Sequence, residues 1–335
     1  QQGVLGLATD IAGGKARPRK AQQHAALIRP FQIFIARTSR VHPVGDKGMD
    51  QKIIALYDEY THAPLPRRVF LTRLAKIAGG TAAAYALLPV LENRYAQAAI
   101  IAEDDSRITT SMTTYPVDAG EMKAYMAKSA TGSNFPSVIV IHENRGLNPH
   151  IRDIARRFAV EGYMALAVDA LTPLGGTPED EDKAREMIGK LDMDVTLQSY
   201  MSAVDFLSDH PEGNAMVASV GFCWGGGMSA KLAVNSENLD AAVVYYGSAP
   251  KSDEVSSITG SLLLHYAGLD ERINAGIPEF EVALKKAKIK YQLHMYEGVN
   301  HAFNNDTNAA RYNKEAADLA WARTLDFIKV RLATA

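Results

Sequence analysis

The chain has 335 residues, of which 47% are hydrophobic and 22% are charged, and its formal net charge at pH 7 is −2. This composition is ordinary for a soluble globular protein, and the charge gives no sign of a nucleic-acid partner or of an anionic membrane surface. A single cysteine cannot form an intramolecular disulfide, so it identifies no redox compartment. The sequence contains no uninterrupted run of about 18 apolar residues, so it predicts no conventional membrane-spanning helix.

Residues 1–48 differ from the rest of the chain in charge. They carry eight Lys or Arg side chains against Asp10 and Asp46, and they show no sustained helical or strand periodicity. The first methionine of the chain is Met49. We therefore expect a basic leader, an upstream translated segment or a cloning remnant, outside the folded domain. The alternative is a basic arm without fixed structure.

Residues 49–99 contain a pattern that resembles a bacterial twin-arginine export signal. Arg67 and Arg68 precede a bulky apolar stretch, then a weakly hydrophobic segment rich in Ala and Gly, and finally Ala96-Gln97-Ala98. This pattern predicts recognition by the twin-arginine export machinery and a periplasmic or exported protein. The alternative is an amphipathic helix with two surface arginines, in a cytoplasmic protein.

Residues 100–335 are predicted to form one α/β domain. Short continuous apolar runs alternate with helical patterns, which indicates a mostly parallel sheet covered by helices on both faces. The predicted strands are 137–143, 164–169, 216–222, 241–247, 261–268 and 291–298. The predicted helices are 150–163, 179–190, 195–209, one that opens at 225, 278–288 and 309–332.

The only cysteine lies between a predicted strand and a predicted helix. The sequence Gly221-Phe222-Cys223-Trp224-Gly225 has the spacing of a nucleophile elbow, with Cys in the position of the serine. Small residues two positions before and after the nucleophile avoid clashes in that strained turn. The helix N-terminus favours a thiolate and a developing oxyanion. The alternative is a buried structural cysteine in a glycine-rich turn.

An elbow nucleophile requires an acid and then a histidine later in the chain. Asp270 follows the predicted strand 261–268, and His301 follows the predicted strand 291–298. Because the carboxyl ends of parallel strands meet at one edge of a sheet, we expect both side chains to lie near Cys223. The three residues predict a Cys-His-Asp catalytic triad.

His142 and Glu143 end the first predicted core strand. They do not begin an H-E-x-x-H motif, because position 146 is glycine, so a zinc-protease site is not predicted. We expect no metal and no cofactor. Backbone N–H groups of Asn144 and Trp224 are the predicted donors to an oxyanion.

Residues 108–332 resemble the dienelactone hydrolase (carboxymethylenebutenolidase-like) family of α/β-hydrolases. The motifs that carry this resemblance are HENRGLNPHIRDIARRFAVEGY, AVDAL, GFCWGGG, AGLDERI and EGVNHAFNND. The resemblance implies a Cys223–His301–Asp270 triad, with Glu143 as an accessory carboxylate that contacts the resting thiol. It also implies an attack of the thiolate on an ester or lactone carbonyl, followed by hydrolysis of an acyl-thioester.

The chain departs from this family at its substrate-binding arginines. One of them lies four residues after the catalytic histidine, where this chain has Asn305, and the other lies in the loop after Asp169, which contains no arginine. Arg145 and Arg272 are possible substitutes. We expect a small-molecule ester or lactone as the substrate. The alternatives are another acyl-transfer enzyme or peptidase on the same fold, and a non-catalytic binding protein.

Overall fold

The computed structural model describes residues 49–63, 65–95 and 99–333. These residues all belong to one compact unit, Ala36–Ala335. The basic segment 1–48 and the predicted export cleavage site at residues 96–98 lie outside the described residues.

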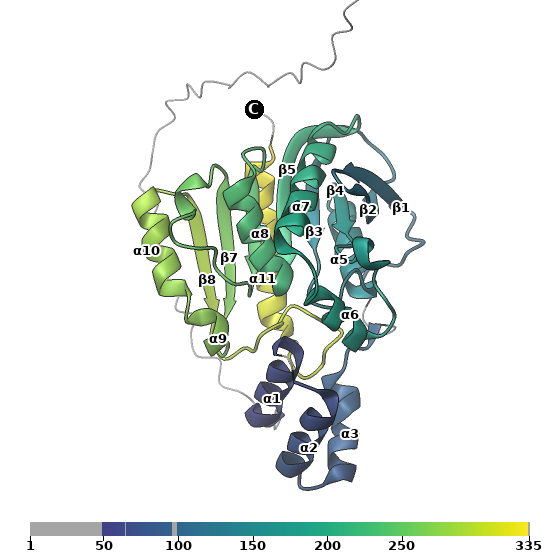
Figure 1. The fold of residues 1–335 in the computed structure, drawn as a ribbon. Coiled ribbons are helices and arrows are strands. Elements are labelled where there is room, and N and C mark those ends of the chain that lie inside the picture. Colours follow the sequence, from purple (N-terminus) through teal and green to yellow (C-terminus); the bar gives the residue numbers. More distant parts are fainter. Residues whose placement is uncertain (1–48, 64, 96–98, 334–335) are drawn as a thin grey trace, which may run out of the picture. The chain divides into compact units, whose positions relative to one another are not determined.

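A mixed eight-stranded sheet forms the centre of the unit (Figure 1). Its strand order is β1-β2-β4-β3-β5-β6-β7-β8; β1 and β2 pair as an antiparallel hairpin, β2 pairs antiparallel with β4, and all other pairs are parallel. The predicted α/β-hydrolase fold class is confirmed. The strands are β1 Ile108–Val117, β2 Gly120–Ser129, β3 Phe135–Ile141, β4 Met164–Val168, β5 Gly213–Phe222, β6 Ala241–Tyr245, β7 Ser261–Ala267 and β8 Tyr291–Tyr296.

Helices cover both faces of the sheet. Val138 and Val140 of β3 pack into one apolar core with the helices α5 and α11, whereas Ile139 and Ile141 pack into a second core with α7, α8 and α10. This alternation follows from the two-residue period of a strand. The helices are α5 Pro149–Val160, α6 Glu181–Ile188, α7 Met193–Ser208, α8 Trp224–Asn235, α9 Glu271–Asn274, α10 Ile277–Ala287 and α11 Lys314–Arg331, with short 3-10 helices at Thr172–Leu174 and Val255–Ser257.

Two features of this domain differ from the sequence-based expectations. The β1–β2 hairpin is not predicted by apolar runs, because most β1 residues are at least partly exposed and many of them are polar. The last helix begins at Lys314 and not at 309, because the Asn313 side chain caps it by accepting from the Ala316 N–H at 3.0 Å.

Three further helices precede the sheet: α1 Gln51–His62, α2 Arg67–Ala78 and α3 Thr81–Leu91. They share a small apolar core, in which Tyr57, Phe70 and Leu74 are almost completely buried. The segment after α3 bonds to the sheet domain, because the Arg94 N–H donates to the Thr307 carbonyl at 2.8 Å. Figure 1 shows these helices beside the end of the sheet at which β7 and β8 terminate.

The paired arginines of the export motif lie in the first turn of α2. Arg67 forms ion pairs with Glu92 at 2.8 Å and with Asp182 at 3.3 Å, and Arg68 is exposed. An amphipathic helix was the alternative to the export interpretation, and both are compatible with this arrangement. Among the described helices, none is long and apolar enough on its own to cross a membrane; α2 and α3 meet that test only as a pair bent by 110°.

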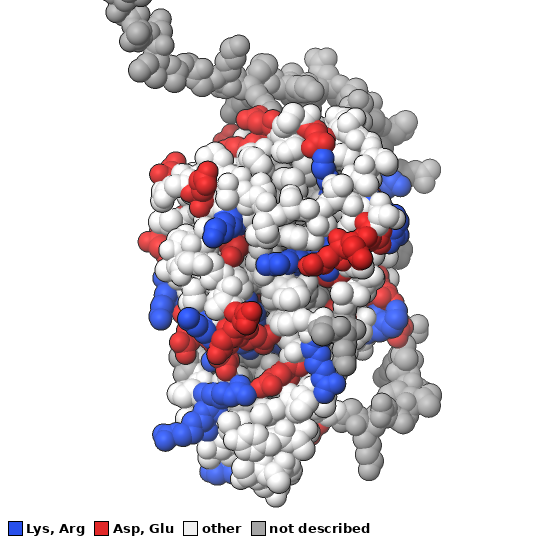
Figure 2. All heavy atoms as spheres, turned by 90° about the vertical axis from the view of Figure 1, so that its right-hand side faces the viewer, with Lys and Arg blue, Asp and Glu red and all other residues white. Residues whose placement is uncertain are grey.

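Charged side chains of both signs are interspersed on the face that Figure 2 shows. The described residues form no large patch of a single sign on that face. This face therefore lacks the basic stripe that is typical of nucleic-acid-binding surfaces.

Candidate active site

Cys223 occupies the tight turn between β5 and α8. Its backbone has φ 56° and ψ −114°, an unusual conformation for a residue other than glycine. A Cβ at Gly221 would lie 1.9 Å from the Gly225 carbonyl oxygen, and a Cβ at Gly225 would lie 2.4 Å from the carbonyl oxygens of Ile141 and His142. The structure therefore contains the elbow that the sequence predicts, and the two flanking glycines are needed for its close backbone contacts.

The thiol lies beside a cavity of about 750 Å³. Cys223 is the N-cap residue of α8, so the first N–H groups and the positive end of that helix lie next to the sulfur. Residues from both the sheet domain and the N-terminal helices line the cavity, among them Trp224, Tyr246, Arg272 and Leu65. The cavity can therefore bring a small molecule to the sulfur.

His301 and Asp270 form a buried pair on the sheet side of this cavity. The His301 Nδ1 lies 2.5 Å from the Asp270 Oδ2, and both side chains are at least 97% buried. Burial alone raises the pKa of Asp270, but the hydrogen bond and the charge of His301 outweigh it and lower that pKa. The Nε2 of His301 has no hydrogen-bond partner among the described residues. The imidazole is thus fixed at one nitrogen and free at the other.

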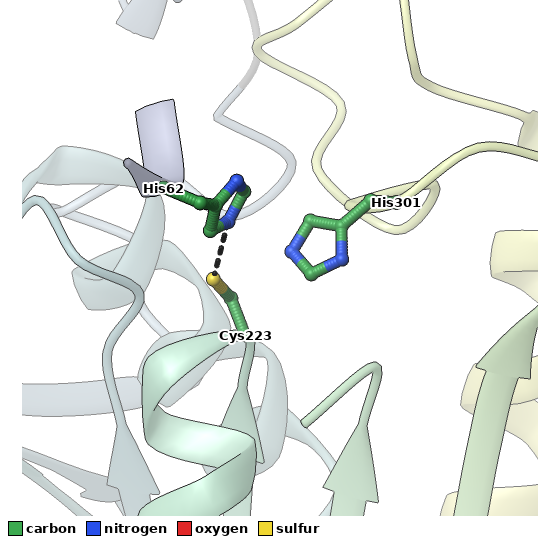
Figure 3. A group of neighbouring side chains, drawn as sticks. All are labelled: His62, Cys223 and His301. Atoms are coloured by element: carbon green, nitrogen blue, oxygen red, sulfur yellow. Dashed lines mark hydrogen bonds between the residues drawn. The ribbon is translucent and has the colours of Figure 1, made fainter. Parts of the chain in front are cut away.

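A second histidine contacts the thiol. The Nε2 of His62, the last residue of α1, lies 3.1 Å from the Cys223 Sγ (Figure 3). Its Nδ1 lies 3.3 Å from the Asp58 Oδ1 and 2.9 Å from the Asp58 carbonyl oxygen. The rings of His62 and His301 pack edge to face, with centroids 4.5 Å apart. The sulfur therefore has two neighbouring imidazoles, each paired with an aspartate.

Sequence reasoning missed His62, because residues 49–99 were interpreted as an export signal. A usable signal was present: Asp58 and His62 are four residues apart, a spacing that brings side chains together on one face of a helix. Nothing in that spacing, however, indicates that this face meets the elbow, since the contact joins residues 161 positions apart in the chain.

The charges around His62 favour its protonated form. Burial lowers the pKa of His62, but the sulfur of Cys223 and the carboxylate of Asp58 outweigh burial, and the pKa is raised. Burial raises the pKa of Asp58, but the neighbouring His301, His62 and Arg311 lower it well below its usual range. Arg311 lies 3.3 Å from the Asp58 carboxylate.

The donor atoms of His62, Cys223 and His301 all lie within 4.8 Å of one another. Imidazole and thiolate groups are typical ligands of zinc and copper. Here, however, the His62 Nε2 and the Cys223 Sγ already form a hydrogen bond with each other. The cluster is therefore suited to proton transfer between the thiol and an imidazole.

The dienelactone hydrolase family model matches residues 122–332, which is more than half of the chain. The chain belongs to the dienelactone hydrolase family. Membership makes it a hydrolase. The helices α1 to α3, and with them His62, precede the matched residues.

Relatives of known sequence and structure agree with this assignment. The "Putative carboxymethylenebutenolidase" of Saccharolobus solfataricus is 33% identical to this chain, and the match covers 64% of this chain and 96% of that protein. Its namesake in Escherichia coli K12 is 30% identical, over 69% of this chain and 90% of that protein. A crystal structure titled "Putative Dienelactone Hydrolase", from Klebsiella pneumoniae, is 29% identical with a TM-score of 0.60, over 65% of this chain and 97% of that one.

Glu143 of this dienelactone hydrolase family member is buried at the end of β3. Its Oε2 accepts a hydrogen bond from the Asn305 Nδ2 at 2.7 Å, while its Oε1 has no partner among the described residues. Glu143 and Cys223 line the same narrow cavity, but the hydrogen-bond partner of the thiol is His62. Asn305, at the position where the family resemblance implies an arginine, thus binds the accessory carboxylate.

The predicted oxyanion donors and the two candidate arginines occupy different environments. Asn144 and Trp224 both line the cavity beside Cys223, and the Asn144 side chain donates to the Thr61 carbonyl at 2.6 Å. Arg272 lines the same cavity. Arg145 is buried and lies 3.3 Å from Asp182, so its charge is already compensated. Of the two arginines, Arg272 is the better candidate to bind a substrate.

Proposed function

We propose that this enzyme hydrolyses a small carboxylic ester or lactone through a Cys223–His301–Asp270 triad and an acyl-thioester intermediate. The observation that carries the proposal is the buried His301–Asp270 pair, with a 2.5 Å contact, beside a cysteine on a nucleophile elbow. A buried aspartate on the Nδ1 of histidine holds the ring in the tautomer and orientation that a catalytic base requires.

The reaction has two halves. The Cys223 thiolate attacks the carbonyl carbon, a C–S bond forms, and the carbonyl oxygen becomes an oxyanion that the N–H groups of Trp224 and Asn144 stabilise. As the C–O bond to the leaving group breaks, the proton that left the Cys223 thiol is delivered to that oxygen. In the second half, His301 accepts a proton from water, and the resulting hydroxide cleaves the thioester.

The size and lining of the cavity support a small substrate. A volume of about 750 Å³ lies within the range of about 300–1,000 Å³ that is typical of small-molecule sites. Arg272 offers one cationic group to a substrate carboxylate. The presence of Asn305 in place of a second arginine favours esters and lactones that need less anionic recognition than a dienelactone does.

A screen of short p-nitrophenyl esters and small lactones tests this function, with wild type compared with Cys223→Ala. We expect hydrolysis by the wild type and its loss in the variant, both with circular dichroism spectra of the folded protein. Equal hydrolysis by both proteins would overturn the cysteine mechanism. A wild type that is folded but inactive on every ester and lactone would favour another acyl-transfer activity or a binding function.

We further propose that the chain is exported through the twin-arginine pathway, which the sequence pattern at Arg67 and Arg68 supports. The test is fractionation of bacterial cells that express the wild type or the Arg67→Lys/Arg68→Lys variant. Lysine keeps both positive charges, so a lysine at position 67 can still form ion pairs with Glu92 and Asp182. We expect the variant to remain in the cytoplasm. An identical distribution of both proteins would contradict export by this route.

A further inference from the structure

We propose that His62, contributed by the N-terminal helix α1, is a catalytic residue that takes the proton of the Cys223 thiol. This inference rests on the proposed cysteine mechanism and on a chain that keeps α1, with no cleavage at residues 96–98. It adds a residue that lies outside the family-matched segment 122–332. The Cys223 Sγ is within hydrogen-bonding distance of His62, at 3.1 Å, whereas the Nε2 of His301 has no hydrogen-bond partner among the described residues. Figure 3 shows both rings near the sulfur, with the hydrogen bond to His62.

His62 has the support that a catalytic base requires. Asp58 lies at the Nδ1 of His62 as Asp270 lies at the Nδ1 of His301, so each imidazole presents its Nε2 towards the site. Arg311 in turn contacts the Asp58 carboxylate at 3.3 Å and its guanidinium packs over the Tyr57 ring, which fixes the orientation of Asp58. The pair is thus held from both α1 and the loop that precedes α11.

The end of α1 is anchored firmly enough to place His62 reproducibly. The Thr61 carbonyl accepts from the Asn144 side chain at 2.6 Å, and the Tyr60 carbonyl accepts from Arg185. These two bonds satisfy carbonyl groups in the last turn of α1, which have no partners within the helix. They join α1 to the loop after β3 and to α6, two parts of the sheet domain that border the cavity.

His62 does not block the cavity. Thr61, His62, Ala63, Leu65 and Pro66 form part of the wall of the cavity of about 750 Å³, and Cys223 lines the same space. A substrate carbonyl can therefore approach the sulfur while His62 is in place. This geometry favours a catalytic role for His62 over a role in which His62 blocks access to Cys223.

Among the described residues, several charged or titratable side chains face His62 or its partners, including Tyr246, which packs against His301. Asp58 lies on α1, Cys223 at the start of α8 and His301 after β8; the others are Arg311 on Asp58, Asp270 on His301, and Glu143, which shares a narrow cavity with His62. Burial lowers the pKa of His62, but Cys223 and Asp58 outweigh it and raise that pKa. The protonated imidazole that proton transfer produces is therefore stabilised by its surroundings.

The two histidines transfer different protons during the reaction. The S–H bond of Cys223 breaks as an N–H bond forms at the His62 Nε2, which leaves a thiolate beside an imidazolium. After the thiolate has attacked, His62 returns this proton to the departing alkoxide as the C–O bond breaks. His301 then accepts a proton from the attacking water and gives it back to the sulfur when the thioester is cleaved, so both rings end neutral.

The test compares His62→Gln and His301→Ala with the wild type in iodoacetamide alkylation of Cys223 across pH 5–10, followed by mass spectrometry. We expect His62→Gln to react at least about 10-fold more slowly at pH 7, because the thiol then has no base at hydrogen-bonding distance. We expect His301→Ala to keep the wild-type profile but to lose turnover. Glu59→Gln, a neighbouring change on the exposed side of α1, should resemble the wild type.

Chemical rescue separates a catalytic role from a merely structural one. Added imidazole should restore part of the turnover of a folded His62→Gly variant, because only the missing base is replaced. A wild-type alkylation profile in His62→Gln, loss of that profile in His301→Ala, or one tightly bound metal ion per chain would overturn the inference. If Cys223→Ala is inactive while His62→Gln is unchanged, only this inference fails; if Cys223→Ala is active, the proposed function itself fails.

Discussion

The two sides of the Cys223 cavity present the same chemistry on different supports. On the sheet side, His301 and Asp270 lie on loops that follow two neighbouring parallel strands, and their side chains are 3% and 2% exposed. On the helix side, His62 and Asp58 are four residues apart on α1, and their side chains are 13% and 21% exposed. The sheet fixes its pair through the fold itself, whereas the helix pair depends on the docking of α1. The sheet pair is therefore the more rigid and the helix pair the more easily displaced.

The sheet side should show the largest loss of activity. His301→Ala is expected to lower the kcat for a short p-nitrophenyl ester by about 1,000-fold or more, and Asp270→Asn by somewhat less, because members of a triad act as a unit. Asp318→Asn, on the exposed face of α11, serves as the control. Similar small losses in both site variants would mean that the helix side alone performs the chemistry.

The stability of the elbow offers a second test of the rigidity of the sheet side. A Cβ at Gly225 would lie 2.4 Å from two backbone carbonyl oxygens, so Gly225→Ala is expected to cost about 3 kcal/mol of unfolding free energy. Gly189→Ala is the matched control, because a Cβ there finds its nearest atom at 3.5 Å. Urea denaturation measures both. Equal urea midpoints for the two variants would show that the backbone of the elbow can move to accept a Cβ at little cost in stability.

Glu143 lies between the two sides, and its removal should have a smaller effect. Glu143→Ala leaves the buried Asn305 amide without its acceptor, and we expect turnover to fall about 10- to 100-fold, in line with a loss of about 1–3 kcal/mol. The pH profile of thiol alkylation should also change. Glu143→Gln keeps an acceptor for Asn305 and separates charge from hydrogen bonding. An unchanged alkylation profile in Glu143→Ala would remove this carboxylate from the mechanism.

The helix pair is expected to make the free energy of unfolding depend on pH. Because the pKa of Asp58 is lowered by folding, its carboxylate contributes stability above its unfolded pKa of about 3.9, and that contribution is lost as the pH falls towards the folded value. Asp58→Asn should therefore cost about 1–2 kcal/mol at pH 7 and progressively less below pH 4. Urea denaturation at several pH values, with Glu59→Gln as control, tests this; an equal cost at pH 3 and pH 7 would contradict it.

The sheet side could be predicted from sequence because its signals are local. Apolar runs mark the buried parallel strands, and Cys223, Asp270 and His301 each follow such a run, at the edge where parallel strands end. The β1–β2 hairpin gave no such signal, because its polar residues face solvent. His62 could not be placed, because its meeting with the sulfur depends on how α1 docks against distant loops and not on any local pattern.

The pairing of Asp58 with Arg311 illustrates the same limit. The two residues are 253 positions apart, and neither belongs to a recognisable motif. Their contact arises only once α1 and the loop before α11 are both in place. Asn305 is a related case: the sequence shows that an arginine is missing, but only the structure shows that the asparagine binds Glu143.

The most direct test of the account is to trap the acyl-enzyme. Wild-type protein is mixed with a short p-nitrophenyl ester, quenched in acid within the first turnover, digested and analysed by mass spectrometry, with Cys223→Ala treated in parallel. The account predicts one added acyl group on the wild-type peptide that contains Cys223, sensitive to hydroxylamine as a thioester is, and none in the variant. An acyl group on another residue, or wild-type turnover by Cys223→Ala, would contradict it.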